Sequence, residues 1–183
     1  MLKKSRVKVE PNYPNIFMLE QLHLTVRSDL KVLTDVQTRF EQFCLQQPFR
    51  EKWSDIQIYC LKLALAEGFS NAVRHAHHDL PPETPIDLEF NLNRDRIELK
   101  IWDWGHPFDP DALEEPKPGT LCQGGYGWFL LRRLVDRVSY RRDRSGRNCL
   151  SIEKQLHSTQ AEIREAEEAA DCHPKLNDFD FNF

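Results

Sequence analysis

Three side chains that could act in chemistry recur at four-residue steps: Glu67, Asn71 and His75. In a helix, this spacing places a carboxylate, an amide and an imidazole along one face. A carboxylate can accept the proton of an attacking hydroxyl, and an amide oxygen can bind a hard cation such as Mg²⁺. The polar face of an ordinary amphipathic helix can show the same pattern, so this segment alone leaves both interpretations open.

The surrounding residues predict a helix over about 53–78 with two different faces. One face is apolar throughout, as is typical of a helix packed on a core: Ile58, Leu61, Leu65, Phe69, Ala72 and Ala76. The other face begins apolar and then turns polar: Ile56, Cys60 and Leu63 are followed by Glu67, Asn71, and Arg74 or His75. This change indicates that the second face lines a cavity, since local rules break most often at functional sites.

A second candidate segment, residues 103–109, follows a predicted hairpin. Alternating apolar and polar residues predict this hairpin over 86–102, with its turn at 93–95. Asp103 then lies just past the end of a half-buried strand, where its carboxylate could accept a hydrogen bond from an exocyclic amine. Gly105 permits a turn or the close approach of a ligand. Taken alone, the segment favours a plain strand-ending turn.

The third segment contains Gly124, Gly125 and Gly127, which open a predicted helix. The apolar positions of this helix include Phe129, Leu130, Leu134 and Val138. Backbone N–H groups at a helix N-terminus attract anions, so a phosphate cradle is one interpretation and a flexible loop is the other. The chain has neither a G-x-x-x-x-G-K-[ST] pattern nor G-x-G-x-x-G after a first strand, which argues against a P-loop and a Rossmann site.

Taken together and in this order, the three segments resemble the boxes of the GHKL ATP-binding family. Within that family, the pattern is most similar to the anti-sigma factor serine/threonine kinases. Their boxes resemble E-x-x-x-N-A-x-x-H, D-x-G-x-x-F-D and G-G-x-G-x-x-L. The matching residues are Glu67, Asn71, Ala72 and His75, then Asp103, Gly105, Phe108 and Asp109, then Gly124, Gly125, Gly127 and Leu130. The resemblance covers about residues 20–156, and Pro107 departs from it in a way that could stiffen the loop.

For the nucleotide base, the resemblance implies that Asp103 receives the adenine amine and that Gly105 lets the backbone approach the ring. It also implies a lid over residues 106–123 that excludes water. For the phosphates, it implies that Asn71 holds Mg²⁺, that His75 belongs to the nucleotide-binding box, and that Gly124, Gly125 and Gly127 supply N–H groups.

The implied activity is ATP-dependent phosphorylation of an anti-sigma factor antagonist, with Glu67 accepting the proton of the attacking hydroxyl. Phosphoryl transfer depends mainly on positioning and charge neutralisation, which such a site would supply. A sigma factor is the second implied partner, and a homodimer is possible. One alternative is a module that binds nucleotide and switches partners without phosphorylating them, although an intact Glu67 argues against it. Another is the catalytic domain of a histidine kinase, for which the N-terminal part is too short.

Composition restricts the remaining classes. The 183-residue chain has a net charge of −4 and a pI of about 6.0, which argues against a general nucleic-acid binder. It has no 18-residue apolar run and no signal-like start, so we expect a soluble cytoplasmic protein. The five cysteines are scattered and form no C-x-x-C pair, which indicates reduced thiols; Cys44 and Cys60 fall at apolar helical positions expected in a core.

The predicted element order is β-α-α-β-β-α-β-β, which favours an α+β fold: a two-layer sandwich with a mixed or antiparallel sheet and helices on one face. Its first strand alternates at Leu22, Leu24 and Val26, and Ser28 is the expected N-cap of a helix running to about residue 46. A last hairpin pairs residues near 137–142 with 148–156. We expect a loose arm over 1–15, one ATP-binding domain over 16–156 and an acidic, aromatic tail over 157–183.

Two further clusters carry weaker interpretations. An arginine-rich stretch between residues 132 and 147 is typical of a solvated surface, and a docking patch for an acidic partner is the sharper alternative. His75, His77 and His78 have no second ligand group at a convincing spacing, so we expect no zinc site.

Overall fold

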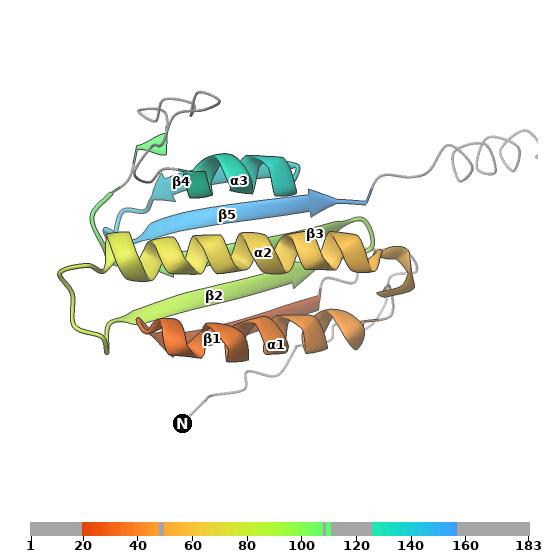
Figure 1. Cartoon of the computed structure of the whole chain (residues 1–183), viewed down its shortest axis with the longest axis horizontal. Helices are drawn as coiled ribbons and strands as arrows, with labels where there is room; N and C mark the ends of the chain where they lie inside the picture. The colour runs from red at the N-terminus through yellow and green to blue at the C-terminus, as the bar shows by residue number, and fades with distance from the viewer. Residues whose placement is uncertain (1–19, 48–49, 108, 111–125, 157–183) are drawn as a thin grey trace, which may run out of the picture.

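A computed structural model of the chain describes residues 20–47, 50–107, 109–110 and 126–156. Its sheet has five antiparallel strands in the order β1-β2-β3-β5-β4, and three helices cover one face (Figure 1). The strands are β1 (Glu20–Arg27), β2 (Pro85–Leu92), β3 (Arg96–Asp103), β4 (Arg137–Arg142) and β5 (Asn148–Gln155). The helices are α1 (Leu33–Leu45), α2 (Asp55–Asn71) and α3 (Tyr126–Leu134). The predicted two-layer α+β sandwich is therefore confirmed, and its sheet is wholly antiparallel.

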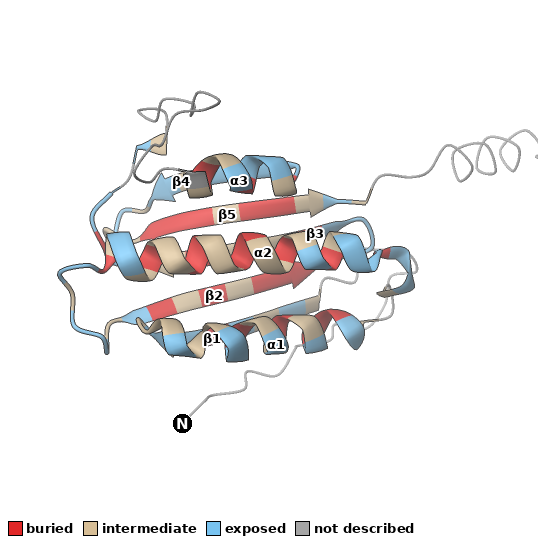
Figure 2. Ribbon diagram, in the orientation of Figure 1, coloured by how far each residue is buried: buried red, intermediate tan, exposed pale blue. Residues whose placement is uncertain are grey.

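The core lies between the helices and the inner face of the sheet, where the red segments of α2, β2 and β5 lie in Figure 2. The central strands β2 and β3 contribute every second side chain, as the pleat requires: Ile86, Leu88, Phe90, Ile97, Leu99 and Ile101. The predicted apolar face of α2 packs against them, with Leu61, Leu65 and Phe69 completely buried. Among the described residues, no helix is both long and apolar enough to cross a membrane.

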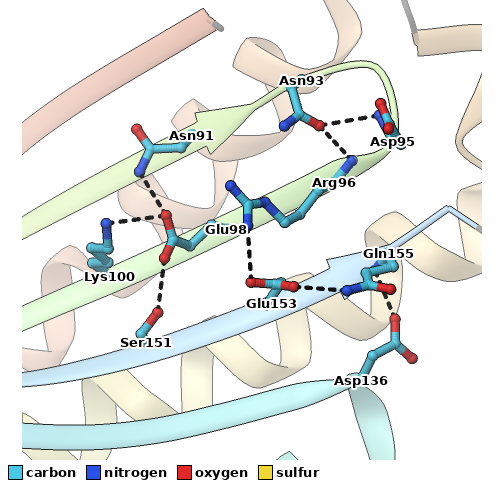
Figure 3. Close-up of polar contacts among 10 residues, drawn as sticks. All are labelled: Asn91, Asn93, Asp95, Arg96, Glu98, Lys100, Asp136, Ser151, Glu153 and Gln155. Atoms are coloured by element: carbon cyan, nitrogen blue, oxygen red, sulfur yellow. Dashed lines mark hydrogen bonds and ion pairs between the residues drawn. The ribbon is translucent and has the colours of Figure 1, made fainter. Parts of the chain in front are cut away.

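The outer face of the sheet carries a polar network, and none of the described helices lies on it (Figure 3). Glu98 accepts hydrogen bonds from Asn91 Nδ2 at 3.2 Å and from Ser151 Oγ at 3.1 Å, and it pairs with Lys100 Nζ at 3.0 Å. Burial alone would raise the pKa of the Glu98 carboxyl, but these partners outweigh it and hold the pKa below its usual value. The half-buried charge of Glu98 on this face is therefore paired.

Helix α2 begins where the sequence supplies a complete capping box. The Ser54 side chain accepts from the Gln57 N–H at 3.2 Å, and the Gln57 side chain accepts from the Ser54 N–H at 3.0 Å. At its far end the helix passes into a wider π-helical turn, η3 (Ala72–Ala76). The predicted helix over 53–78 is thus α-helical for most of its length and changes character at its functional end.

Three local predictions are wrong. Asp29, not Ser28, caps the segment before α1: it accepts from the Lys31 N–H at 2.9 Å, and a short 3-10 turn, η1 (Leu30–Val32), precedes the helix. Cys60 is only partly buried, because α2 buries its other face, whereas Cys44 is in the core as expected. Ile56, at the start of the second face, is 75% exposed.

The inward face of α3 also differs from the prediction. The helix ends at Leu134, and Val138 lies in β4. Its buried positions are Trp128 and Leu131, followed by Val135 just after the helix, while Leu130 is 41% exposed. The prediction failed because four consecutive apolar residues fit two helical phases equally well, and packing against α2 chose between them.

Ser54→Ala should destabilise the domain by about 1 kcal/mol, because it removes a side-chain cap from the helix that carries most of the candidate site. Urea unfolding monitored by circular dichroism measures this. Ser28→Ala is the matched control: its hydroxyl caps nothing, so its unfolding midpoint should stay within error of the wild type. Equal losses in the two variants would contradict the assigned cap.

Candidate functional site

A cavity of about 390 Å³ opens between the end of α2 with η3, the end of β3, the start of α3 and the last hairpin. Its volume is within the range of small-molecule sites. The lining combines apolar walls with a few polar groups: Gly68, Asn71, Ala72, His75, Ala76, Asp103, His106, Pro107, Gly127, Trp128, Tyr140 and Leu150. Segments that are far apart in the sequence, including all three candidate segments, therefore meet at one site.

Asp103 is the buried acid of this cavity, with only 4% of its surface exposed. Its Oδ1 accepts hydrogen bonds from the Gly105 N–H at 2.9 Å and from Asn148 Nδ2 at 2.8 Å. Burial raises the pKa of the Asp103 carboxyl, and the two hydrogen bonds only partly oppose this shift. Among the described residues nothing donates to Oδ2, so the side chain has one acceptor oxygen available to a ligand.

Asn148 fixes this carboxylate, and the sequence analysis did not single it out. The residue is completely buried at the start of β5, directly opposite Asp103 in the strand register. Its Nδ2 also lies 3.0 Å from the Gly105 carbonyl oxygen, and its Oδ1 accepts from Arg142 Nη1 at 3.2 Å. Only the pairing of β3 with β5 reveals this role, because an asparagine at a strand start carries no distinctive signal in the sequence.

Gly105 is buried beside Asp103, and backbone fills the space where its side chain would be. A Cβ atom at this position would lie 2.0 Å from the carbonyl oxygen of Ala76 in η3. One residue earlier, the Trp104 N–H donates to His77 Nε2 at 3.0 Å. The turn after Asp103 is therefore held against the end of α2 on one side and against Asn148 on the other. Whether Gly105 also approaches a base stays a prediction.

A second pair of polar side chains, Glu67 and Asn71, comes from α2 and lies beside Gly127 at the start of α3. A Cβ atom on Gly127 would lie 2.8 Å from Glu67 Oε2 and 3.5 Å from Asn71 Nδ2. Glycine at this position thus leaves room beside a carboxylate and an amide at the same end of the cavity. His75, one turn further along, also lines the cavity, although it is exposed.

The close approach of α2 to the sheet depends on Gly68, which the sequence analysis also passed over. A Cβ atom there would meet Ile101 Cδ1 at 2.6 Å and Leu150 Cδ2 at 2.8 Å. A glycine in the middle of a helix was the available signal, since this residue weakens helices and needs a packing reason.

The structure brings together Asn71, His75, Asp103 and Gly127 in one cavity, with Glu67 and Gly105 directly beside it. Phe108, Gly124 and Gly125 lie outside the described residues, as does most of the predicted lid. Gly127, the glycine of this segment that the structure describes, lines the cavity, and the phosphate-binding role of the segment stays a prediction.

Comparison with known proteins identifies the family of this chain. The sequence profile of the family described as "Histidine kinase-like ATPase domain" matches residues 26–154. Two curated relatives are named "Serine-protein kinase RsbW". The one from Halalkalibacterium halodurans is 36% identical over 91 residues, which are 45% of this chain and 54% of the relative. The one from Bacillus subtilis is 32% identical over 90 residues, which are 45% of this chain and 56% of the relative. The chain spans about half the length of the curated relatives it matches.

A solved structure of the RsbU and RsbW domains of Rv1364c from Mycobacterium tuberculosis has a TM-score of 0.54 at 14% identity. The match covers 76% of this chain and 33% of that chain, and it supports the fold alone. The family expected from the three boxes is thus confirmed by a profile that runs from the end of β1 almost to the end of β5 and includes α1, α2 and α3. This chain belongs to the histidine kinase-like ATPase domain family.

Proposed function

We propose that this protein is an ATP-dependent serine/threonine kinase that phosphorylates an anti-sigma factor antagonist and also binds a sigma factor in the cytoplasm. The observation that carries the proposal is the buried carboxylate of Asp103, which lines the same cavity as Asn71 and Gly127 and to whose second oxygen no described residue donates; Glu67 lies beside that cavity. The names of the curated relatives support the choice of a serine kinase within the family.

The residues at the Asp103 end fit a nucleobase. The apolar residues Ala72, Ala76 and Leu150 line the same cavity as the Asp103 carboxylate. An exocyclic amine would donate to Asp103 Oδ2, while Asn148 and Gly105 hold Oδ1 in place. Adenine carries such an amine, so this end is assigned to the base of ATP.

The residues at the Gly127 end fit phosphates and a divalent cation. The cradle beside Gly127 contains an amide oxygen and a carboxylate, the hard oxygen ligands that Mg²⁺ accepts. Bound Mg²⁺ would neutralise phosphate charge, and Asn71 would hold it. Glu67 would accept the hydroxyl proton of the protein substrate, and Gly124, Gly125 and Gly127 would offer N–H groups at the start of α3.

The arginine-rich surface supports a docking role for only some of its members. Arg132, Arg133 and Arg144 are exposed, as an acidic partner would require. In contrast, Arg142 binds the Gly105 carbonyl oxygen, and Arg147 stacks on Trp102 with its guanidinium carbon 4.7 Å from the ring centroid. Arg142 and Arg147 therefore make contacts within the fold, so partner variants should be confined to Arg132, Arg133 and Arg144.

The second candidate is a module that binds nucleotide and exchanges partners without transferring phosphate. It shares the Asp103 end of the site and differs only in the use of Glu67. Incubation with labelled ATP, Mg²⁺ and antagonists encoded nearby separates the two functions: label on a serine or threonine of the antagonist supports the kinase, and ATP binding without transfer to any antagonist favours the module.

Asp103→Asn should weaken ATP binding by about 1–3 kcal/mol, because an amide nitrogen would replace the acceptor oxygen that faces the adenine amine. The variant should nevertheless be at least as stable as the wild type at neutral pH. Burial raises the pKa of the Asp103 carboxyl, so keeping it ionised at neutral pH opposes folding, and a neutral amide removes that cost.

Isothermal titration calorimetry and urea unfolding measure these two opposite effects. Asp95→Asn is the matched control, since it removes the same charge from an exposed turn at the other end of the sheet. Wild-type affinity in Asp103→Asn would contradict the assignment of the base-binding end.

Glu67→Gln should slow phosphate transfer by about 10²–10⁴-fold at saturating ATP, while ATP binding survives. A general base acts on the hydroxyl proton during the chemical step, so its loss does not weaken binding of the nucleotide. Asn71→Ala should differ, because it should also weaken Mg²⁺-dependent ATP binding. Rates of antagonist phosphorylation, with affinities measured separately, test both variants.

Glu83→Gln provides the control, as this residue is an exposed glutamate in the turn before β2. If Glu67→Gln transfers phosphate at the wild-type rate, Glu67 is not the base and the proton must leave by another route.

A further inference from the structure

His77 occupies an unusual place next to the candidate site. It follows η3 directly, and only 3% of its surface is exposed, whereas its neighbours His75 and His78 are exposed. Its Nε2 accepts a hydrogen bond of 3.0 Å from the backbone N–H of Trp104, the residue after Asp103. The imidazole therefore joins the end of α2 to the turn that follows β3.

This contact defines the protonation state of the ring. A nitrogen that accepts from a backbone N–H carries no proton, so the neutral ring must hold its proton on Nδ1. Nδ1 is buried and has no hydrogen-bond partner among the described residues. The fold thus accepts an unpaired donor, which costs free energy, in order to present an acceptor to Trp104.

The turn that His77 holds through Trp104 contains Gly105, one of the two groups that fix the Asp103 carboxylate. The Gly105 N–H donates to Asp103 Oδ1, and Gly105 itself lies against the Ala76 carbonyl, one residue before His77. On the other side, Asn148 and Arg142 donate to the Gly105 carbonyl oxygen. Release of the Trp104 N–H would free one side of this turn and loosen the donor that orients Asp103.

We propose that His77 is a positioning residue for the nucleotide: its neutral imidazole holds the turn from Asp103 to Gly105 in the conformation that binds the base, and protonation of the ring releases that turn. The nucleotide part of this inference rests on the proposed function, whereas the contact between His77 and Trp104 does not. Nucleotide affinity then becomes sensitive to acidification.

The groups around His77 determine the direction of this effect. Burial lowers the pKa of His77, and the facing carboxylate of Asp103 on β3 opposes this shift only in part. Of the other charged groups nearby, Arg142 on β4 points to the Gly105 carbonyl oxygen, and exposed His78 pairs with Asp79. A released turn therefore takes up a proton more readily than the held turn. The held turn is favoured fully above the ordinary histidine pKa of about 6.5 and progressively less as the pH falls below it.

Nitrogen-15 NMR of the histidine rings in the whole protein tests the contact without any nucleotide. At neutral pH we expect the His77 ring to be neutral, with its proton on Nδ1, and the Trp104 amide signal to move as that ring titrates. A ring protonated on Nε2, or a Trp104 amide that ignores the titration, would overturn the inference.

The effect on the site is tested by ATP affinity measured between about pH 8 and pH 5.5, across the histidine range. His77→Phe fills the space but cannot accept, so its affinity at pH 8 should fall about tenfold, the size expected for one lost buried hydrogen bond. His77→Gln retains an acceptor near the position of Nε2 and cannot titrate. It should keep near wild-type affinity at pH 8 and lose less affinity on acidification than the wild type. His78→Gln, the matched control, should follow the wild-type profile.

Asp103 and the ATP phosphates also affect how ATP affinity changes with pH, but they do so in both His77→Gln and the wild type. The difference between these two pH profiles therefore reports on His77. Wild-type affinity in a folded His77→Phe, or equal loss on acidification in His77→Gln and the wild type, would overturn the proposal. If the wild type binds no ATP at all, the proposed function fails and the nucleotide part of this inference fails with it. The NMR result then decides separately whether His77 holds the turn.

Discussion

The candidate site depends on one carboxyl group, that of Asp103, which is buried in the domain and held in a fixed orientation. Asp103 is almost fully buried, and burial raises its pKa, so the fold must supply donors to its charged form. Those donors come from opposite directions: Asn148 from the neighbouring strand and the Gly105 N–H from a turn packed on η3. The strand register, the end of α2 and the turn after β3 thus all bear on one oxygen of Asp103, while no described residue donates to the other oxygen.

The same constraint explains why α2 changes character near the site. Its first part is an ordinary helix with a capping box and a buried apolar face. Gly68 then lets it approach β3 and β5, and the π-helical turn of η3 carries the backbone to Gly105 and the ring of His77 to Trp104. The polar residues of the helix lie on the side that this arrangement turns toward α3.

Much of the fold was predictable because its signals are periodic. The alternation in the two hairpins and the long apolar stripe of α2 predicted the elements, their order and the sandwich. The types and spacing of Glu67, Asn71 and Asp103 singled these residues out, and the structure places Asn71 and Asp103 in one cavity with Glu67 beside it, while their roles stay predictions. The places of Asn148 and His77 were not predictable, because they follow from strand register and from the contact of two segments far apart in the chain. The inward face of α3 failed because a run of apolar residues fits more than one helical phase.

The most direct test of the central claim compares ATP with purine riboside triphosphate, which lacks only the exocyclic amine. If the available oxygen of Asp103 receives that amine, the analogue should bind at least about tenfold more weakly, since a buried acceptor would lose its partner. Titration calorimetry on the wild type at neutral pH with Mg²⁺ measures the ratio. Equal affinity for the two nucleotides would show that Asp103 does not read the base and would contradict the account of the site.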